Sequence, residues 1–124
     1  MLTLNKPSIL IIDDDQTILR AFRRIFQRRG YTVTVAAKGS EAIEQICSKH
    51  FDVALIDFCL PDMEGSELFS LIQQSSASTV KVMLTGKQLP DNCSDGADVL
   101  LGKPIQPDKL LDIIETKLKN RNIE

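Results

Sequence analysis

The chain has 124 residues, of which 43% are hydrophobic, so it can fill one compact core but not two full domains. Its 15 basic and 17 acidic side chains give a net charge of −2, without the basic excess that nucleic-acid binding requires. No apolar run reaches the roughly 18 residues of a membrane span, and the N-terminus lacks the apolar stretch of a signal peptide. We therefore expect one cytoplasmic domain that binds neither nucleic acid nor membrane directly.

The three cysteines, Cys47, Cys59 and Cys93, are an odd number without paired spacing. This favours buried or half-buried reduced thiols over a disulfide framework. His50 is the one histidine and has no partner at a metal-binding spacing, so we expect it at the C-terminal end of a helix.

In the first part of the chain, short apolar runs alternate with helical periodicity. Residues 9–12 predict a buried strand that ends at acids. Residues 17–29 repeat apolar side chains at helical spacing, with Asp15 as a suitable N-cap and Gly30 as a stop. Residues 31–36 are rich in β-branched side chains and predict a second strand.

The next helix has Ser40 as a candidate cap. Its expected inner face is Ala42, Ile43, Ile46 and Cys47. Residues 53–56 predict a third strand that ends at Asp57, before a loop and a helix at 68–72. The remaining elements are strands at 80–84 and 99–101 and a helix over 107–119.

Apolar strands that alternate with helices predict an α/β fold with a doubly wound, five-stranded parallel sheet. We assign residues 9–119 to the domain, residues 1–8 to an N-terminal extension and residues 120–124 to a C-terminal tail. Open sheets of this kind place their functional sites at the carboxyl ends of the strands.

Five polar side chains fall at or just after those strand ends. They are Asp13, Asp14, Asp57, Thr85 and Lys103. Three neighbouring carboxylates disfavour each other's ionisation, so at least one is expected to have a raised pKa. A hard cation such as Mg²⁺ relieves this repulsion, and a lysine and a hydroxyl suit the oxygens of a phosphoryl group. Taken singly, the same residues also fit a helix cap, a solvated loop or ordinary turns.

Several segments of the chain resemble the CheY-like receiver domains of two-component response regulators. They are residues 9–15, 57–65, 83–86, 96–98 and 102–104, within a resemblance that spans 9–118. This resemblance implies that Asp57 is the phosphoacceptor. It implies that Asp14, Asp57 and the backbone carbonyl of Cys59 bind Mg²⁺, while Asp13 acts mainly through water.

The resemblance further implies that Thr85 and Lys103 bind phosphoryl oxygens and that the Lys103–Pro104 peptide bond is cis. The implied phosphodonor is a sensor histidine kinase or a histidine phosphotransfer protein, and the output partner is unknown. Such a domain is a phosphoacceptor in signalling and not an enzyme, beyond self-phosphorylation from small donors and autodephosphorylation.

Two features depart from the family pattern. The interval between Thr85 and Lys103 is about one helical turn short, so we expect the fourth helix to be shortened or missing. Leu100 stands at the position of the family's switch aromatic. Both changes lie on the face commonly used for output and dimerisation, so we expect a monomer or weak dimer.

Two alternative functions remain open from the sequence. Residues 13–17 also fit the D-x-D-x-T signature of haloacid-dehalogenase-like phosphatases, with Asp13 as the nucleophile. The altered output face is also compatible with a receiver-like interaction module that no longer uses phosphate. The phosphatase alternative leaves the Asp57 segment unexplained. The interaction-module alternative leaves all five polar residues at the strand ends without a function.

Overall fold

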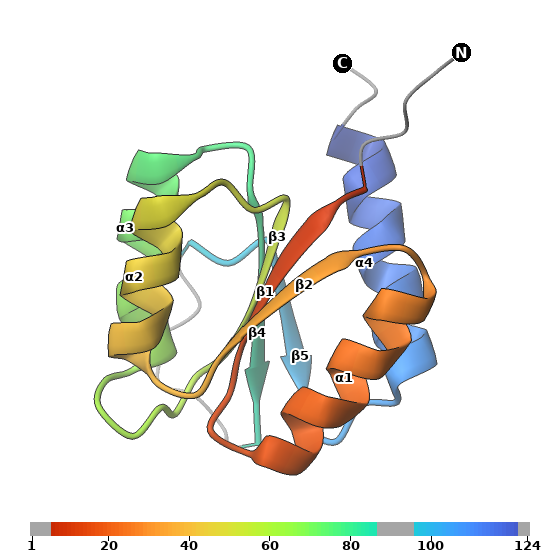
Figure 1. Cartoon of the computed structure of the whole chain (residues 1–124), viewed down its shortest axis with the longest axis horizontal. Helices are drawn as coiled ribbons and strands as arrows, with labels where there is room; N and C mark the ends of the chain where they lie inside the picture. The colour runs from red at the N-terminus through yellow and green to blue at the C-terminus, as the bar shows by residue number, and fades with distance from the viewer. Residues whose placement is uncertain (1–5, 87–95, 122–124) are drawn as a thin grey trace.

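The structure is a computed structural model that describes residues 6–86 and 96–121. Within these residues, five parallel strands form one sheet in the order β2-β1-β3-β4-β5 (Figure 1). The strands are β1 (Ser8–Ile12), β2 (Thr32–Ala36), β3 (Val53–Asp57), β4 (Val80–Thr85) and β5 (Val99–Gly102). The helices are α1 (Gln16–Arg28), α2 (Gly39–Ser48), α3 (Leu68–Ser75) and α4 (Pro107–Arg121), with a 3₁₀ turn at Gly65–Glu67 before α3.

The sheet is covered on both faces, as the sequence predicts. Figure 1 shows α1 and α4 on one side and α2 and α3 on the other. Alternate residues of the central strands enter two separate cores: Ile9 and Ile11 pack with α1 and α4, whereas Leu10 and Ile12 pack with α2 and α3. Both faces of β1 are therefore buried, which explains why its sequence is continuously apolar. The predicted doubly wound, five-stranded parallel sheet is confirmed.

The ends of α1 follow the local sequence. The Asp15 carboxylate accepts hydrogen bonds from the amides of Thr17 (2.9 Å) and Ile18 (3.4 Å), which satisfies helix N–H groups that have no partner within the helix. Gly30 has a φ of 92°, a conformation that glycine adopts without steric cost, and it follows the helix as predicted.

Two predictions about α2 were wrong. The helix begins at Gly39, so Ser40 lies inside it and does not cap it. Cys47 is exposed, because the buried stripe of this short helix is narrow and consists of Gly39, Ala42 and Ile46. Cys59 is likewise a free, exposed thiol, so the expectation of buried or half-buried thiols fails for both.

The first of the two departures from the family pattern lies outside the described residues. The prediction of a shortened or missing fourth helix concerns residues 87–95, and so does the position of Cys93. Leu100 is described and stands on the edge strand β5, where it is 45% exposed. None of the helices in the described ranges combines the length and the apolar character needed to cross a membrane.

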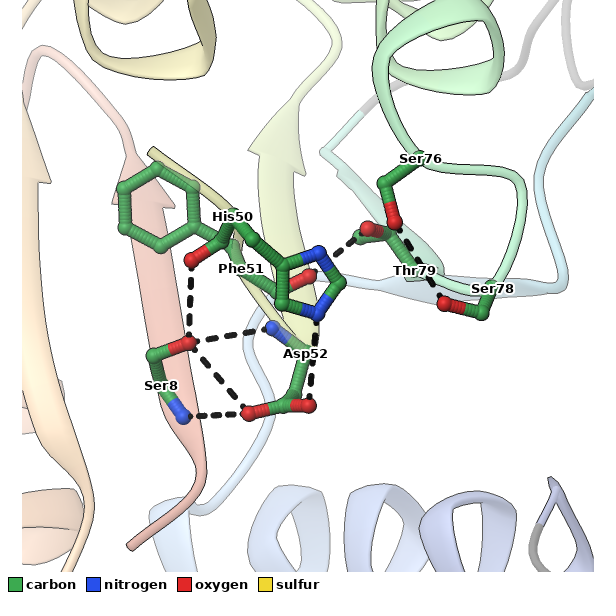
Figure 2. A network of polar contacts seen from close by, with 7 residues as sticks. All are labelled: Ser8, His50, Phe51, Asp52, Ser76, Ser78 and Thr79. Atoms are coloured by element: carbon green, nitrogen blue, oxygen red, sulfur yellow. Dashed lines mark hydrogen bonds and ion pairs between the residues drawn. The ribbon is translucent and has the colours of Figure 1, made fainter. Parts of the chain in front are cut away.

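A network of polar contacts links the segments at the amino ends of the strands (Figure 2). The Asp52 carboxylate accepts hydrogen bonds from the amide (2.8 Å) and the hydroxyl (3.3 Å) of Ser8, and it pairs with His50 at 3.6 Å. The Thr79 hydroxyl donates to the carbonyl of Phe51 (2.7 Å). His50 lies two residues beyond the end of α2, where its carbonyl accepts from the Ser8 hydroxyl.

Candidate functional site

The carboxyl ends of four strands meet at the opposite edge of the sheet. Asp13 follows β1, Asp57 ends β3, Thr85 ends β4 and Lys103 follows β5. Their positions follow from the parallel register, in which Ile12 pairs with Ile56 and Thr85 with Gly102. The Lys103 amide donates to the Thr85 carbonyl (2.8 Å), which fixes the two neighbouring strand ends together. The Lys103–Pro104 peptide bond is cis, as the resemblance implied.

Lys103 connects two buried carboxylates. Its Nζ lies 2.8 Å from Oδ2 of Asp13 and 3.3 Å from Oδ1 of Asp57. Asp13 is 2% exposed and Asp57 is 7% exposed, whereas Asp14 is exposed. The other oxygen of Asp13 accepts a hydrogen bond from the Asp15 amide (2.9 Å). The buried carboxylates are thus held by one ammonium group, and the exposed one lies beside them.

The charges of the site are set by burial as well as by neighbours. Burial raises the pKa of the Asp57 carboxyl, the charge of Asp13 raises it further, and Lys103 and the Cys59 amide oppose the shift. Burial disfavours the charged form of Lys103, but its contacts with the two aspartates outweigh this, so its pKa is raised. One carboxyl therefore has a raised pKa, as expected, although burial is a larger cause than the like charges that the sequence suggested.

The three carboxylates provide oxygen donors suited to a hard divalent cation. One oxygen from each of Asp13, Asp14 and Asp57 lies within 4.8 Å of the others. One or two carboxylates together with water is the usual way in which proteins hold Mg²⁺. The residues present therefore fit such a cation, and the exposed carboxylate of Asp14 leaves the group accessible from solvent.

The segment from residue 58 to residue 65, which we call the 58–65 loop, folds back on itself beside Asp57. The Gly65 amide donates to the Phe58 carbonyl (2.6 Å), and Cys59 and Glu64 form an antiparallel bridge. Gly65 lies so close to the Asp57 carbonyl that a β-carbon there would collide with it. The position thus requires glycine for close approach of the backbone, and the loop holds the Cys59 backbone next to Asp57.

One residue of this region was missed in the sequence. Asp62, in the 58–65 loop, accepts hydrogen bonds from the amides of Gly39 and Ser40 at the start of α2. These contacts lower the pKa of Asp62 below its ordinary value. The two segments are more than 20 positions apart, so no local sequence pattern joins them. The one weak signal for an external cap was Lys38, the residue before the helix, whose side chain is a poor N-cap.

Comparisons with known proteins agree with this fold. Residues 9–115 match the model of the response regulator receiver domain. A receiver domain protein (CheY-like) from Methanospirillum hungatei has a TM-score of 0.89 and 37% identity, and the match covers 94% of this chain and 97% of that one. A response regulator from Burkholderia pseudomallei, solved with a phosphorylated aspartic acid and a calcium ion, has a TM-score of 0.81 and 25% identity over 93% of this chain and 70% of that chain.

A curated relative is longer than this chain. The phosphoglycerate transport system transcriptional regulatory protein of Salmonella typhimurium is 34% identical over 118 residues, which are 92% of this chain and 28% of the regulator. The chain spans about half the length of other transcriptional regulators that it matches at 27% identity, such as one from Bacillus subtilis. The similarity therefore concerns one domain of those proteins.

Proposed function

This chain belongs to the response regulator receiver domain family, a signalling domain of two-component systems, and from that premise we propose that Asp57 accepts a phosphoryl group. The observation that carries the proposal is the position of Lys103, whose ammonium group contacts Asp13 and Asp57 together. The phosphorylated aspartic acid named for the related regulator from B. pseudomallei supports this chemistry.

In the proposed reaction, a carboxylate oxygen of Asp57 attacks the phosphorus atom, and the bond from phosphorus to the donor's nitrogen or oxygen breaks. The product is an aspartyl phosphate, and the electron pair of the broken bond leaves with the donor. Lys103 exchanges its contact with Asp57 for a contact with a phosphoryl oxygen, and the Thr85 hydroxyl donates to another. Lys103 thus has a negatively charged partner both before and after the phosphoryl transfer.

Asp13, Asp14, Asp57 and the backbone carbonyl of Cys59 are the groups that we propose hold Mg²⁺, with Asp13 acting mainly through water. When bound, this cation supplies positive charge that offsets the charge on the transferred phosphoryl group. The protein's own contribution is to favour the ionised form of Asp57 and to leave one carboxylate of the group open to solvent. Lys103 opposes the effect of burial on the Asp57 carboxyl, and Asp14 remains exposed to solvent.

The proposed donor is a sensor histidine kinase or a histidine phosphotransfer protein, acting in the cytoplasm on residues 9–119 as the functional unit. The output partner is a protein whose binding changes with phosphorylation, and Leu100 is the atypical residue on the face proposed to meet it. We propose a monomer or weak dimer. Self-phosphorylation from small donors and slow hydrolysis of the aspartyl phosphate are the most that the domain itself would catalyse.

The experiment is labelling by acetyl phosphate, followed by intact-protein mass spectrometry, of the parent chain and Asp57→Asn. The proposal predicts one added phosphoryl group on the parent, loss of labelling with EDTA, and no labelling of Asp57→Asn. Labelling that persists in Asp57→Asn but disappears in Asp13→Asn would support the phosphatase alternative. A parent chain that resists both acetyl phosphate and phosphohistidine donors would support the phosphate-independent module.

A further inference from the structure

The N-terminus of α2 is capped by a residue from the 58–65 loop. Lys38, which precedes the helix, provides no side-chain cap. Instead, one oxygen of the Asp62 carboxylate accepts a hydrogen bond from the Gly39 amide (2.7 Å) and the other accepts one from the Ser40 amide (2.9 Å). Free amides at a helix start need such acceptors. The contact therefore joins the start of α2 to the loop that follows Asp57.

Contacts within the loop connect Asp62 to the backbone beside Asp57. Cys59 and Glu64 pair across the loop, and the Gly65 amide closes it onto Phe58 (2.6 Å). These contacts tie the two sides of the loop to each other. Fixing its tip at Asp62 therefore restricts the backbone of Cys59 as well.

A second contact reinforces the attachment of the tip. The Leu60 amide donates to the Met63 carbonyl (3.1 Å), which forms a tight turn around Asp62. The side chain of Met63 packs onto Gly39 so closely that a β-carbon at position 39 would collide with it. Polar and apolar contacts thus hold the same turn against the first residues of α2.

We propose that Asp62 is a positioning residue for the cation site: it holds the 58–65 loop against α2 and thereby fixes the Cys59 carbonyl beside Asp57. The inference rests on the proposed function, since it concerns the same site. Coupling between two contacts is reciprocal. Binding of a cation is therefore expected to strengthen the attachment of Asp62 to α2. Through this contact, occupancy of the cation site would affect that helix.

The test separates this role from ordinary helix capping. Asp62→Ala removes both hydrogen bonds. Asp62→Asn keeps one side-chain oxygen, which can accept only one of the two hydrogen bonds. Lys38→Ser adds a cap from the helix's own preceding residue, whose extended backbone suits it, without attaching the loop. Asp108→Ala is the matched control, because Asp108 is an exposed acid in the first turn of α4, away from the loop.

Calorimetric titration with Mg²⁺ and amide hydrogen exchange of the metal-free protein are the two measurements. We expect Asp62→Ala to weaken Mg²⁺ binding by about 10-fold, the usual scale for groups that support metal ligands, and Asp62→Asn to weaken it less. We also expect faster exchange at residues 59–65. In the Asp62→Ala/Lys38→Ser double variant, we expect the new cap to restore stability to urea. The Mg²⁺ affinity and the slower amide exchange of the loop are not expected to return. Asp108→Ala binds Mg²⁺ like the parent.

Mg²⁺ affinity in Asp62→Ala equal to that of the parent would overturn the inference, whatever the exchange rates. Recovery of both affinity and loop protection in the double variant would also overturn it, because Asp62 would then be a replaceable helix cap. If the parent itself does not bind Mg²⁺, the cation site of the proposed function is wrong. The two failures are therefore distinguishable.

Discussion

The two edges of the sheet carry aspartates under opposite conditions. At the amino edge, Asp52 accepts hydrogen bonds from the amide and hydroxyl of Ser8 and has His50 as a neighbour (Figure 2). At the carboxyl edge, Asp13 and Asp57 are more deeply buried, face each other and share one lysine. The Asp52 carboxylate therefore completes the fold, whereas Asp13 and Asp57 keep a repulsion that Lys103 offsets only in part and that a bound cation would reduce further.

The largest effect is expected where the shared positive charge is removed. Lys103→Ala leaves Asp13 and Asp57 facing each other without a cation, and breaking a buried pair in this way costs about 3 kcal/mol of unfolding free energy. Urea unfolding at neutral pH measures the loss. Adding Asp57→Asn to Lys103→Ala is expected to restore part of it, and a double variant no more stable than Lys103→Ala would show that repulsion is not the cause.

The same substitution also tests the proposed role of Lys103 in the response to phosphorylation. Since the Lys103 ammonium is proposed to follow the phosphoryl group, Lys103→Ala is expected to remove the conformational response to phosphorylation more than it weakens Mg²⁺ binding. Amide exchange with and without the phosphoryl analogue beryllofluoride measures the response. Lys103→Arg, which keeps the charge, is the control, and a full response in Lys103→Ala would contradict the assigned role.

A somewhat smaller loss is expected for Gly65→Ala. The added β-carbon would collide with the Asp57 carbonyl and press on the side chain of Ile56, and such overpacking costs roughly 2 kcal/mol. Gly30→Ala separates crowding from backbone strain, because Gly30 has a positive φ but open space around it. Urea unfolding of both variants gives the comparison. A Gly65→Ala protein as stable as the parent would mean that the loop does not approach Asp57 so closely.

At the amino edge, Asp52→Ala is expected to destabilise the fold by about 1.5 kcal/mol, because hydrogen bonds from Ser8 to a charged acceptor are lost. Mg²⁺ binding and labelling by acetyl phosphate are expected to stay unchanged in this variant. Thermal or urea unfolding, together with a labelling assay, checks both statements. If Asp52→Ala impaired phosphorylation as strongly as it impaired stability, the division of roles between the two edges would not hold.

The smallest expected effect is a dependence on pH. The folded-state pKa of Asp57 is raised above the ordinary carboxyl value of about 4, so the folded protein binds the proton more readily than the unfolded chain. As pH falls from neutral through the raised pKa, this group's contribution to stability increases, and it levels off below the unfolded value. The stability difference between the parent and Asp57→Asn in EDTA is therefore expected to narrow on acidification. A difference that stays constant would contradict the raised pKa.

The sequence predicts what depends on local pattern and on the geometry of parallel sheets. Apolar runs such as residues 53–56 become strands because both of their faces are buried, and polar residues after strands converge because parallel strands end at one edge. Asp62 as the cap of α2 and the exposure of Cys47 depend on how α2 meets the rest of the molecule, which no neighbouring residue encodes. Like charges predict a raised pKa for at least one of the three carboxyls; the structure raises that of Asp57, and the depth of burial, which is a tertiary property, is the larger cause.

The most direct test is urea unfolding of the parent and of Asp57→Asn, each with EDTA and with excess Mg²⁺. Without metal, Asp57→Asn is expected to be the more stable protein, because it removes a buried charge that faces Asp13. Bound Mg²⁺ stabilises the protein that binds it, by about 2.7 kcal/mol at a concentration about 100 times the Kd, so the parent is expected to become the more stable. If Asp57→Asn were less stable in EDTA, or if Mg²⁺ stabilised both proteins equally, the carboxyl edge would not be the cation and phosphoryl site described above.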